Sequence, residues 1–215
     1  MKKKKFLDPN IENKSKTVED KIQLFEHQGV SLPLPTEIEI SESGTCNRSC
    51  SFCPRSAADF EDKKEFISNE LYEKLCLELN ELNYKGTIRF SGFVEPLLDK
   101  NIYNLLKMGR KYLPDCNIEM VTNGDPLNLK RLKKLFENGL NRILISAYDS
   151  KEDADKLEDL CKSADLSTEQ YIVRHRYYSE DQDFGITLSN RAGLMENAEY
   201  KIKALKDPLK NPCYI

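Results

Sequence analysis

The sequence lacks any apolar run that could cross a membrane, since none of its stretches reaches the roughly 18 apolar residues that such a helix needs. It also lacks an export signal, because the basic start is followed by Phe6-Leu7-Asp8-Pro9 rather than by an apolar segment. Opposite charges nearly cancel, with 33 Lys and Arg against 36 Asp and Glu. With a net charge of −3, the protein as a whole does not attract nucleic acid or anionic lipid, so only a local basic groove could bind them. We therefore expect a cytoplasmic protein with no membrane partner and no nucleic-acid partner.

Histidine is scarce, and cysteine is odd in number. The two histidines, His27 and His175, belong to no recognisable zinc motif. Seven cysteines in a chain without an export signal argue against a disulfide framework and favour reduced thiols or metal ligands. Three of the seven, Cys46, Cys50 and Cys53, fall within eight residues. This group is the first candidate for a functional site.

The length of 215 residues favours one domain with one substantial core. We expect an N-terminal arm over residues 1–33, the domain itself over residues 34–196 and a C-terminal connector over residues 197–215. The stretch Leu32-Pro33-Leu34-Pro35 is too rich in proline for a helix or a central strand.

Within the domain, the apolar pattern switches repeatedly between the strand and the helix period. Residues 36–41 alternate polar and apolar side chains, which predicts a first strand. Leucines spaced by three and four residues, with Ser68 as the N-cap, predict a helix over residues 69–84. The same patterns predict further strands at 87–91, 117–122 and 142–146, helices at 102–113, 129–136 and 150–163, and candidate fifth and sixth strands at 171–178 and 185–190.

Four alternations of strand and helix indicate right-handed β-α-β units in a parallel α/β sheet, either an open sheet or a partial barrel. The run Ile143-Leu144-Ile145 agrees with this, because strands of such sheets are buried on both faces. Residues 179–183 are too few for a crossover helix, so the regular pattern breaks between the last two strands.

The cysteine group has the spacing Cys-x3-Cys-x2-Cys and directly follows the first expected strand. Thiolates at such short intervals are typical iron–sulfur ligands, and three of them on a four-iron cube leave one iron open to another molecule. A structural zinc site would need a fourth ligand. Three buried cysteines without a metal are the remaining alternative, which the Asn, Arg, Ser and Pro residues of the loop disfavour.

With Phe52 just before the third cysteine, this loop resembles the signature of the radical S-adenosylmethionine (radical SAM) family. The resemblance covers residues 34–215 and implies a partial (β/α)6 TIM-like barrel of parallel strands. It implies a 4Fe–4S cluster on Cys46, Cys50 and Cys53, with SAM across the C-terminal strand ends, where parallel β/α folds place ligands.

The resemblance also implies an activity. In the family, the reduced cluster cleaves SAM to a 5′-deoxyadenosyl radical, which abstracts hydrogen from a peptide, a sugar or another small substrate. A low-potential electron donor such as flavodoxin or ferredoxin is implied as a partner. The alternative is a non-catalytic iron–sulfur electron-transfer or binding module, which would need neither six strand–helix units nor the SAM-binding segments.

Several of those segments can be matched. Residues 90–98 resemble the family's Gly-Gly-Glu-type segment, in which Gly92 and the carboxylate of Glu95 would hold the ammonium group of SAM. Val94 stands where the family has glycine. The resemblance implies further SAM-binding residues at Phe52, Thr122, Asn123 and Ser146. Arg174, on one face of the fifth expected strand, is a candidate ligand of SAM or substrate, or it could meet a carboxylate inside the barrel or be exposed. Each match has an ordinary alternative: Asn123-Gly124 is a common turn sequence, and Glu95 could be a surface charge.

The C-terminal end resembles the point at which SPASM-type members continue into an extension with auxiliary clusters. Pro212-Cys213-Tyr214 would mark that point. Because one thiolate cannot hold a cube, we expect a single cluster per chain unless Cys76, Cys116 or Cys161 approaches Cys213. The same reasoning suggests a truncated form of a longer enzyme.

Overall fold

The computed structural model describes residues 22–56 and 60–177. The chain divides into two compact units. The larger one contains the chain up to Arg48 and again from Asp62, and the smaller one contains, among the described residues, 49–56 and 60–61. In the described part of the chain, no helix is long and apolar enough to span a membrane.

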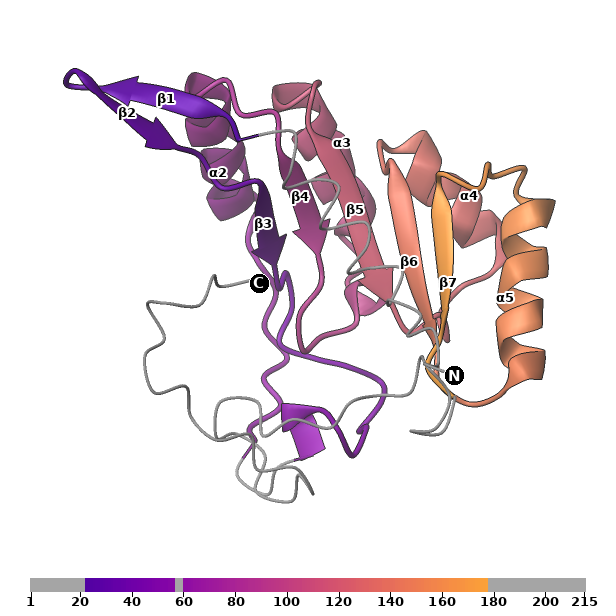
Figure 1. Ribbon diagram of the computed structural model, residues 1–215. Helices are drawn as coiled ribbons and strands as arrows, with labels where there is room; N and C mark the ends of the chain where they lie inside the picture. Colours follow the sequence, from indigo (N-terminus) through magenta and orange to yellow (C-terminus); the bar gives the residue numbers. More distant parts are fainter. Residues whose placement is uncertain (1–21, 57–59, 178–215) are drawn as a thin grey trace, which may run out of the picture. The chain divides into compact units, whose positions relative to one another are not determined.

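The larger unit is built on a parallel sheet whose strands follow one another in the order β3-β4-β5-β6-β7 (Figure 1). These strands are Glu37–Ile40 (β3), Thr87–Phe90 (β4), Asn117–Thr122 (β5), Arg142–Ala147 (β6) and Tyr171–His175 (β7). The helices between them are Asn69–Glu81 (α2), Ile102–Tyr112 (α3), Leu129–Glu137 (α4) and Lys151–Ser163 (α5), with short 3-10 helices at Pro54–Ser56 (η1) and Pro96–Leu98 (η2). The α/β fold and the four predicted strand–helix units are therefore confirmed, whereas the predicted sixth strand lies outside the described residues.

Three of the helices begin at a side-chain cap. The hydroxyl of Ser68 accepts the N–H of Leu71 at 3.1 Å, which confirms the predicted N-cap of α2. Asn128 caps α4 and Ser150 caps α5 in the same way. Helix α2 ends at Glu81, before the predicted residue 84, because Asn83 adopts a positive φ of 49° that a helix cannot continue through.

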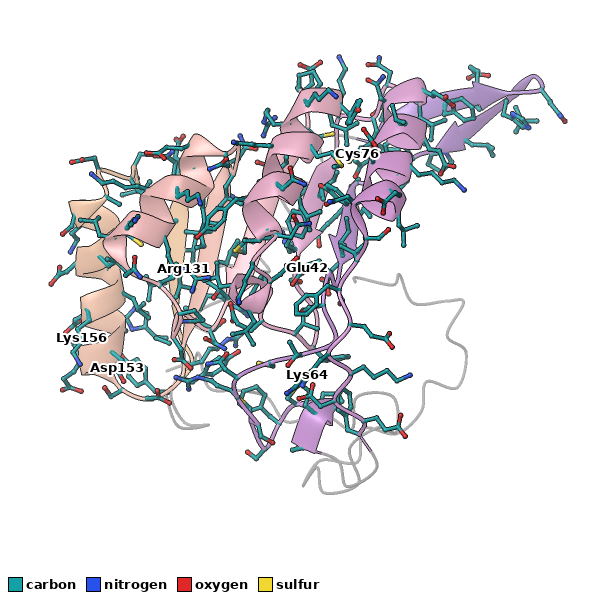
Figure 2. All side chains as sticks on the ribbon, turned by 180° about the vertical axis from the view of Figure 1, so that it is seen from behind. Glu42, Lys64, Cys76, Arg131, Asp153 and Lys156 are labelled. Atoms are coloured by element: carbon teal, nitrogen blue, oxygen red, sulfur yellow. The ribbon has the colours of Figure 1, made fainter. Side chains whose placement is uncertain are left out.

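All four helices lie on one face of the sheet, as the opposite views of Figure 1 and Figure 2 show. Alternate strand residues point to this face, and the helices supply mainly leucines. Together they form one core that includes Ile88, Phe90, Ile118, Met120, Ile143 and Ile145 from the strands, and Leu105, Leu106, Leu132 and Leu135 from the helices. This core fixes the strand ends from which the candidate site is built.

The other face of the sheet carries buried charges. The guanidinium of Arg89 donates to Glu119 at 2.6 Å and to Glu37 at 2.7 Å, and the Arg89 and Glu119 side chains are each only 2 % exposed. Asn117 donates to the second oxygen of Glu119 at 2.7 Å, and Arg142 lies 3.7 Å from it. Two arginines thus balance two glutamates on neighbouring strands, so that no member of the group is left uncompensated.

Part of the expected N-terminal arm forms an antiparallel hairpin of Leu24–His27 (β1) and Val30–Pro33 (β2). It extends beyond the sheet in Figure 1. Gln28 and Gly29 turn the chain with φ angles of 50° and 77°, the geometry of a two-residue hairpin turn. The proline-rich stretch thus contributes to a separate two-stranded sheet and to no central strand, as its composition predicts.

Candidate functional site

The cysteine loop begins directly after β3 and passes from the larger unit to the smaller one between Arg48 and Ser49. Cys50 and Cys53 belong to the smaller unit, where the N–H of Cys53 donates to the carbonyl of Cys50 at 2.9 Å. The hydroxyl of Ser56 donates to the carbonyl of Cys53 at 2.8 Å. These bonds fold the second half of the loop into a tight turn, which also carries the half-buried Phe52.

Among residues 22–56 and 60–177, no three His, Cys, Asp or Glu side chains are arranged as a metal site. Cys46 belongs to the larger unit, and Cys50 and Cys53 belong to the smaller one. Their joint role as iron ligands stays a prediction that rests on their spacing.

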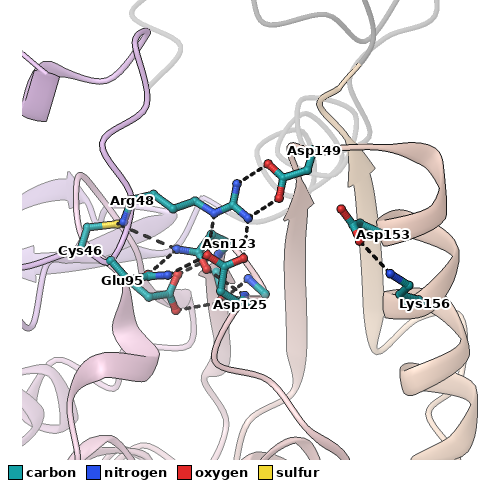
Figure 3. A network of polar contacts seen from close by, with 11 residues as sticks. Cys46, Arg48, Glu95, Asn123, Asp125, Asp149, Asp153 and Lys156 are labelled. Atoms are coloured by element: carbon teal, nitrogen blue, oxygen red, sulfur yellow. Dashed lines mark hydrogen bonds and ion pairs between the residues drawn. The ribbon is translucent and has the colours of Figure 1, made fainter.

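Cys46 belongs to the larger unit and has N–H donors directed at its sulfur. The backbone N–H of Arg48 lies 3.4 Å from Sγ, and the side-chain amide of Asn123 lies 3.9 Å from it (Figure 3). The preceding carbonyl, of Thr45, accepts the N–H of Glu95 at 3.0 Å. Hydrogen bonds to sulfur are among the features that stabilise cluster thiolates, so the surroundings of Cys46 suit an iron ligand.

Glu95 is buried, with 1 % of its surface exposed, and joins the loop after β4 to the end of β5. Its carboxylate accepts from the hydroxyl of Thr122 at 2.6 Å, from the N–H of Asn123 at 2.8 Å and from the N–H of Leu97 at 3.1 Å. Burial raises the pKa of this carboxyl, and the three hydrogen bonds oppose that shift. Oε1 accepts two of these bonds and Oε2 one, so Oε2 keeps the capacity to accept another donor.

Gly92 lets the loop after β4 pass close to the end of β3. Its φ is +115°, and a Cβ at this position would lie 2.1 Å from the hydroxyl of Ser41. That hydroxyl donates to the carbonyl of Ser91 at 3.0 Å. Only glycine fits these two conditions, so Gly92 has a structural requirement independent of any ligand.

The other predicted SAM positions on the sheet fall into two groups. Thr122 and Asn123 adjoin Glu95, and the hydroxyl of Thr122 is already engaged, donating to Glu95 and accepting from Gly124 at 3.1 Å. Ser146 lies beside Arg174 on the neighbouring strand. Its hydroxyl is buried and has no hydrogen-bond partner among the described residues. A buried hydroxyl without a partner at a predicted SAM position fits a ligand contact there.

The sequence did not reveal the residues that join the cysteine loop to the strand ends. Arg48 donates to Asp125, beyond the end of β5, and to Asp149, beyond the end of β6 (Figure 3). The amide of Asn47 also donates to Asp125, at 2.7 Å. The available signal was the placement of two aspartates shortly after two parallel strands, which end at the same edge of the sheet.

Glu42 is a further residue that the sequence did not reveal. It is 1 % exposed, and neither of its carboxyl oxygens has a hydrogen-bond partner among the described residues. Burial raises the pKa of this carboxyl from its ordinary value of 4.5 to about 8, and Asp99 and Glu95 act in the same direction. The sequence did contain a sign that Glu42 is buried. It lies two residues after Ile40 and is in phase with Ile38 and Ile40, whose side chains pack into the core.

We expect the Glu42→Gln substitution to remove a pH dependence of stability. Between pH 4.5 and pH 8 the unfolded chain releases the Glu42 proton and the folded chain keeps it. The free energy of unfolding should therefore fall as pH rises through this window, by at most about 1.4 kcal/mol per pH unit. Urea unfolding of the two proteins at several pH values tests this, with the exposed Glu65→Gln as control. Parallel pH profiles of wild type and Glu42→Gln would contradict the assignment.

The structure thus defines a class of protein: parallel strand–helix units with a three-cysteine loop after the first strand of the sheet and polar side chains at the strand ends. Residues 40–187, more than half of the chain, match the Radical SAM superfamily. The chain belongs to this superfamily.

Two curated relatives place the chain within it. It is 31% identical over 168 residues to the S-adenosyl-L-methionine-dependent 2-deoxy-scyllo-inosamine dehydrogenase of Niallia circulans, a match that covers 78% of this chain and 63% of the relative. It is 31% identical over 122 residues to the GTP 3',8-cyclase of Campylobacter lari, covering 54% of this chain and 35% of that enzyme. The chain therefore spans less than two thirds of the length of these relatives.

Solved structures agree with the fold. The crystal structure of BtrN in complex with AdoMet and 2-DOIA superimposes with a TM-score of 0.63 at 29% identity, over 76% of this chain and 63% of BtrN. Native anSMEcpe with bound AdoMet superimposes with a TM-score of 0.52 at 17% identity, over 64% of this chain and 42% of that protein, and shows the likeness of fold alone.

Proposed function

We propose that this chain is the catalytic domain of a radical SAM enzyme that abstracts hydrogen from a small polar substrate. The observation that carries the proposal is the superfamily match over residues 40–187, which contains the whole cysteine loop. Superfamily membership implies a 4Fe–4S cluster and SAM as cofactors. When bound, they supply the 5′-deoxyadenosyl radical upon one-electron reduction.

The protein's own residues bind and orient these groups. Cys46, Cys50 and Cys53 would hold three irons and leave the fourth open. The carboxylate of Glu95 would accept a hydrogen bond from the ammonium of SAM, because its Oε2 atom still has acceptor capacity. Ser146 and Arg174, adjacent on β6 and β7, contact polar groups of SAM or substrate. Orientation is the main contribution of such residues, because the radical must form within reach of one C–H bond.

The proposed class of substrate is based on a relative whose match covers 78% of this chain. That enzyme is named for 2-deoxy-scyllo-inosamine, and its identity of 31% extends over 78% of this chain. Within the described part of the chain, the sheet face away from the helices carries polar side chains, among them Glu39, Ser146 and Arg174. Hydroxyl and amine groups can bond to such a face. We propose a small polyhydroxylated or amino-bearing substrate and a low-potential flavodoxin or ferredoxin as electron donor.

The Glu95→Gln substitution should weaken SAM binding while the cluster stays in place. The loss of one charged acceptor corresponds to about 1.5–3 kcal/mol, or roughly 10- to 150-fold in Kd. Equilibrium dialysis with labelled SAM on protein with full iron content measures it, and Glu78→Gln on the exposed side of α2 is the control. Wild-type affinity in fully loaded Glu95→Gln would remove Glu95 from the site.

Reductive cleavage of SAM tests the activity. Reconstituted protein is reduced with dithionite under anaerobic conditions, and 5′-deoxyadenosine and methionine are quantified. We expect both products in equal amounts, and neither from Cys46→Ala. A loaded, reducible protein that leaves SAM intact would favour the electron-transfer module instead.

A further inference from the structure

Arg48 occupies a special place in the chain. It follows Cys46 by two residues and is the last residue of the larger unit before the segment that carries Cys50 and Cys53. Its side chain is 21% exposed and turns back to the sheet, where it meets two carboxylates from different strand ends (Figure 3).

The contacts use both edges of the guanidinium. Nε donates to Asp125 Oδ2 at 2.7 Å, and Nη2 contacts the other oxygen of Asp125. Nη1 and Nη2 donate to the two oxygens of Asp149, both at 2.7 Å. The group also lies over the ring of Tyr148, 5.6 Å from its centroid. Two bidentate pairs on one planar group define both its position and its orientation, which a lysine ammonium cannot reproduce.

Removal of this group would have two effects on the site. The carboxylates of Asp125 and Asp149 would lose the charge between them and repel each other at the ends of β5 and β6. The backbone of Arg48 would lose its anchor, and this backbone supplies the N–H that lies 3.4 Å from Cys46 Sγ. The side chain is thus linked to the sulfur of Cys46 through its own main chain.

We propose that Arg48 is a positioning residue for the cluster, with Asp125 and Asp149 as a clamp that fixes the first cysteine of the loop on the ends of β5 and β6. The proposal rests on the proposed function in one respect only, the role of Cys46 as an iron ligand. In this proposal Arg48 acts through the geometry of the loop, by its contacts with Asp125 and Asp149.

Iron release from the reconstituted chain tests the clamp. Wild type, Arg48→Gln, Arg48→Lys and Asp149→Asn are loaded anaerobically and mixed with a ferrous-iron chelator. Loss of an outer partner of a metal ligand costs about 10- to 100-fold in metal affinity, and we expect iron release to accelerate by a similar factor in all three variants. Arg48→Lys keeps the positive charge but loses the planar group that forms two bidentate pairs. It should therefore not restore the slow iron release of wild type. Combining Arg48→Gln with Asp149→Asn should add little to either single change.

Lys156→Gln is the matched control, because Lys156 pairs with Asp153 on α5 in the same view yet touches no part of the clamp.

Thermal unfolding of the iron-free proteins is measured in parallel. A merely structural Arg48 would lower the unfolding temperature and leave iron release at low temperature unchanged, and that result overturns the proposal. Wild-type release rates in Arg48→Lys and Asp149→Asn overturn it as well. A wild-type chain that takes up no iron overturns both this inference and the proposed function, whereas loaded variants that behave as wild type overturn the clamp alone.

Discussion

Replacement of Cys46, Cys50 or Cys53 by alanine is expected to abolish iron binding, whereas Cys76→Ala and Cys161→Ala should keep it. The loop cysteines are partly exposed, while Cys76 and Cys161 are fully buried. Burial raises the pKa of the Cys76 thiol to about 11 and that of the Cys161 thiol to about 12. A thiol must lose its proton to bind iron, so the raised pKa makes iron binding less favourable at these two buried cysteines.

Iron and sulfide analysis after anaerobic reconstitution measures this effect. Wild type should hold about four irons per chain and show the broad absorption band of thiolate-ligated iron. Loss of iron in Cys76→Ala or Cys161→Ala, together with full iron in the loop variants, would show that the wrong cysteines have been assigned.

The second large effect is expected at Arg89. Arg89→Met leaves Glu119 buried at 2 % exposure without its closest positive partner. Removal of one member of a buried ion pair typically costs about 3–5 kcal/mol, and urea unfolding should show a loss of this size. Arg89→Met combined with Glu119→Met should recover part of the loss, because the buried Glu119 carboxylate is removed together with its closest partner, whereas Glu37 still loses its contact with Arg89.

The control for Arg89 is an exposed pair on the same unit. Lys85 and Asp115 lie 3.4 Å apart with side chains 55% and 65% exposed, so Lys85→Met should cost less than about 1 kcal/mol. Equal losses in Arg89→Met and Lys85→Met would mean that the buried group is no more important than a surface pair.

The sequence predicts the regular part of this fold because local rules and tertiary packing agree there. Apolar residues alternate along each strand, as Ile118 and Met120 do on β5, and pack into the core with the helices. The Ser68 cap sets the start of α2. The β1–β2 hairpin was not predicted, because Pro33 and Pro35 argue only against a central strand and the turn signal Gln28-Gly29 is weak by itself.

The site is predictable only where a motif is local. The cysteine spacing spans eight residues and can be recognised directly. The clamp joins Arg48 to partners 77 and 101 residues away, and an arginine or aspartate in a loop is equally consistent with a solvated charge. Glu42 was missed for a different reason. It is in phase with Ile38 and Ile40, so the strand pattern predicts an apolar residue at this position, whereas the sequence has a glutamate.

The electron paramagnetic resonance spectrum of the reduced cluster, recorded with and without SAM, tests the central claim most directly. If three cysteines leave one iron open and SAM binds there, SAM must change the spectrum of the wild-type chain, and Glu95→Gln must need more SAM for the same change. Identical spectra with and without saturating SAM, from protein with full iron content, would contradict the claim.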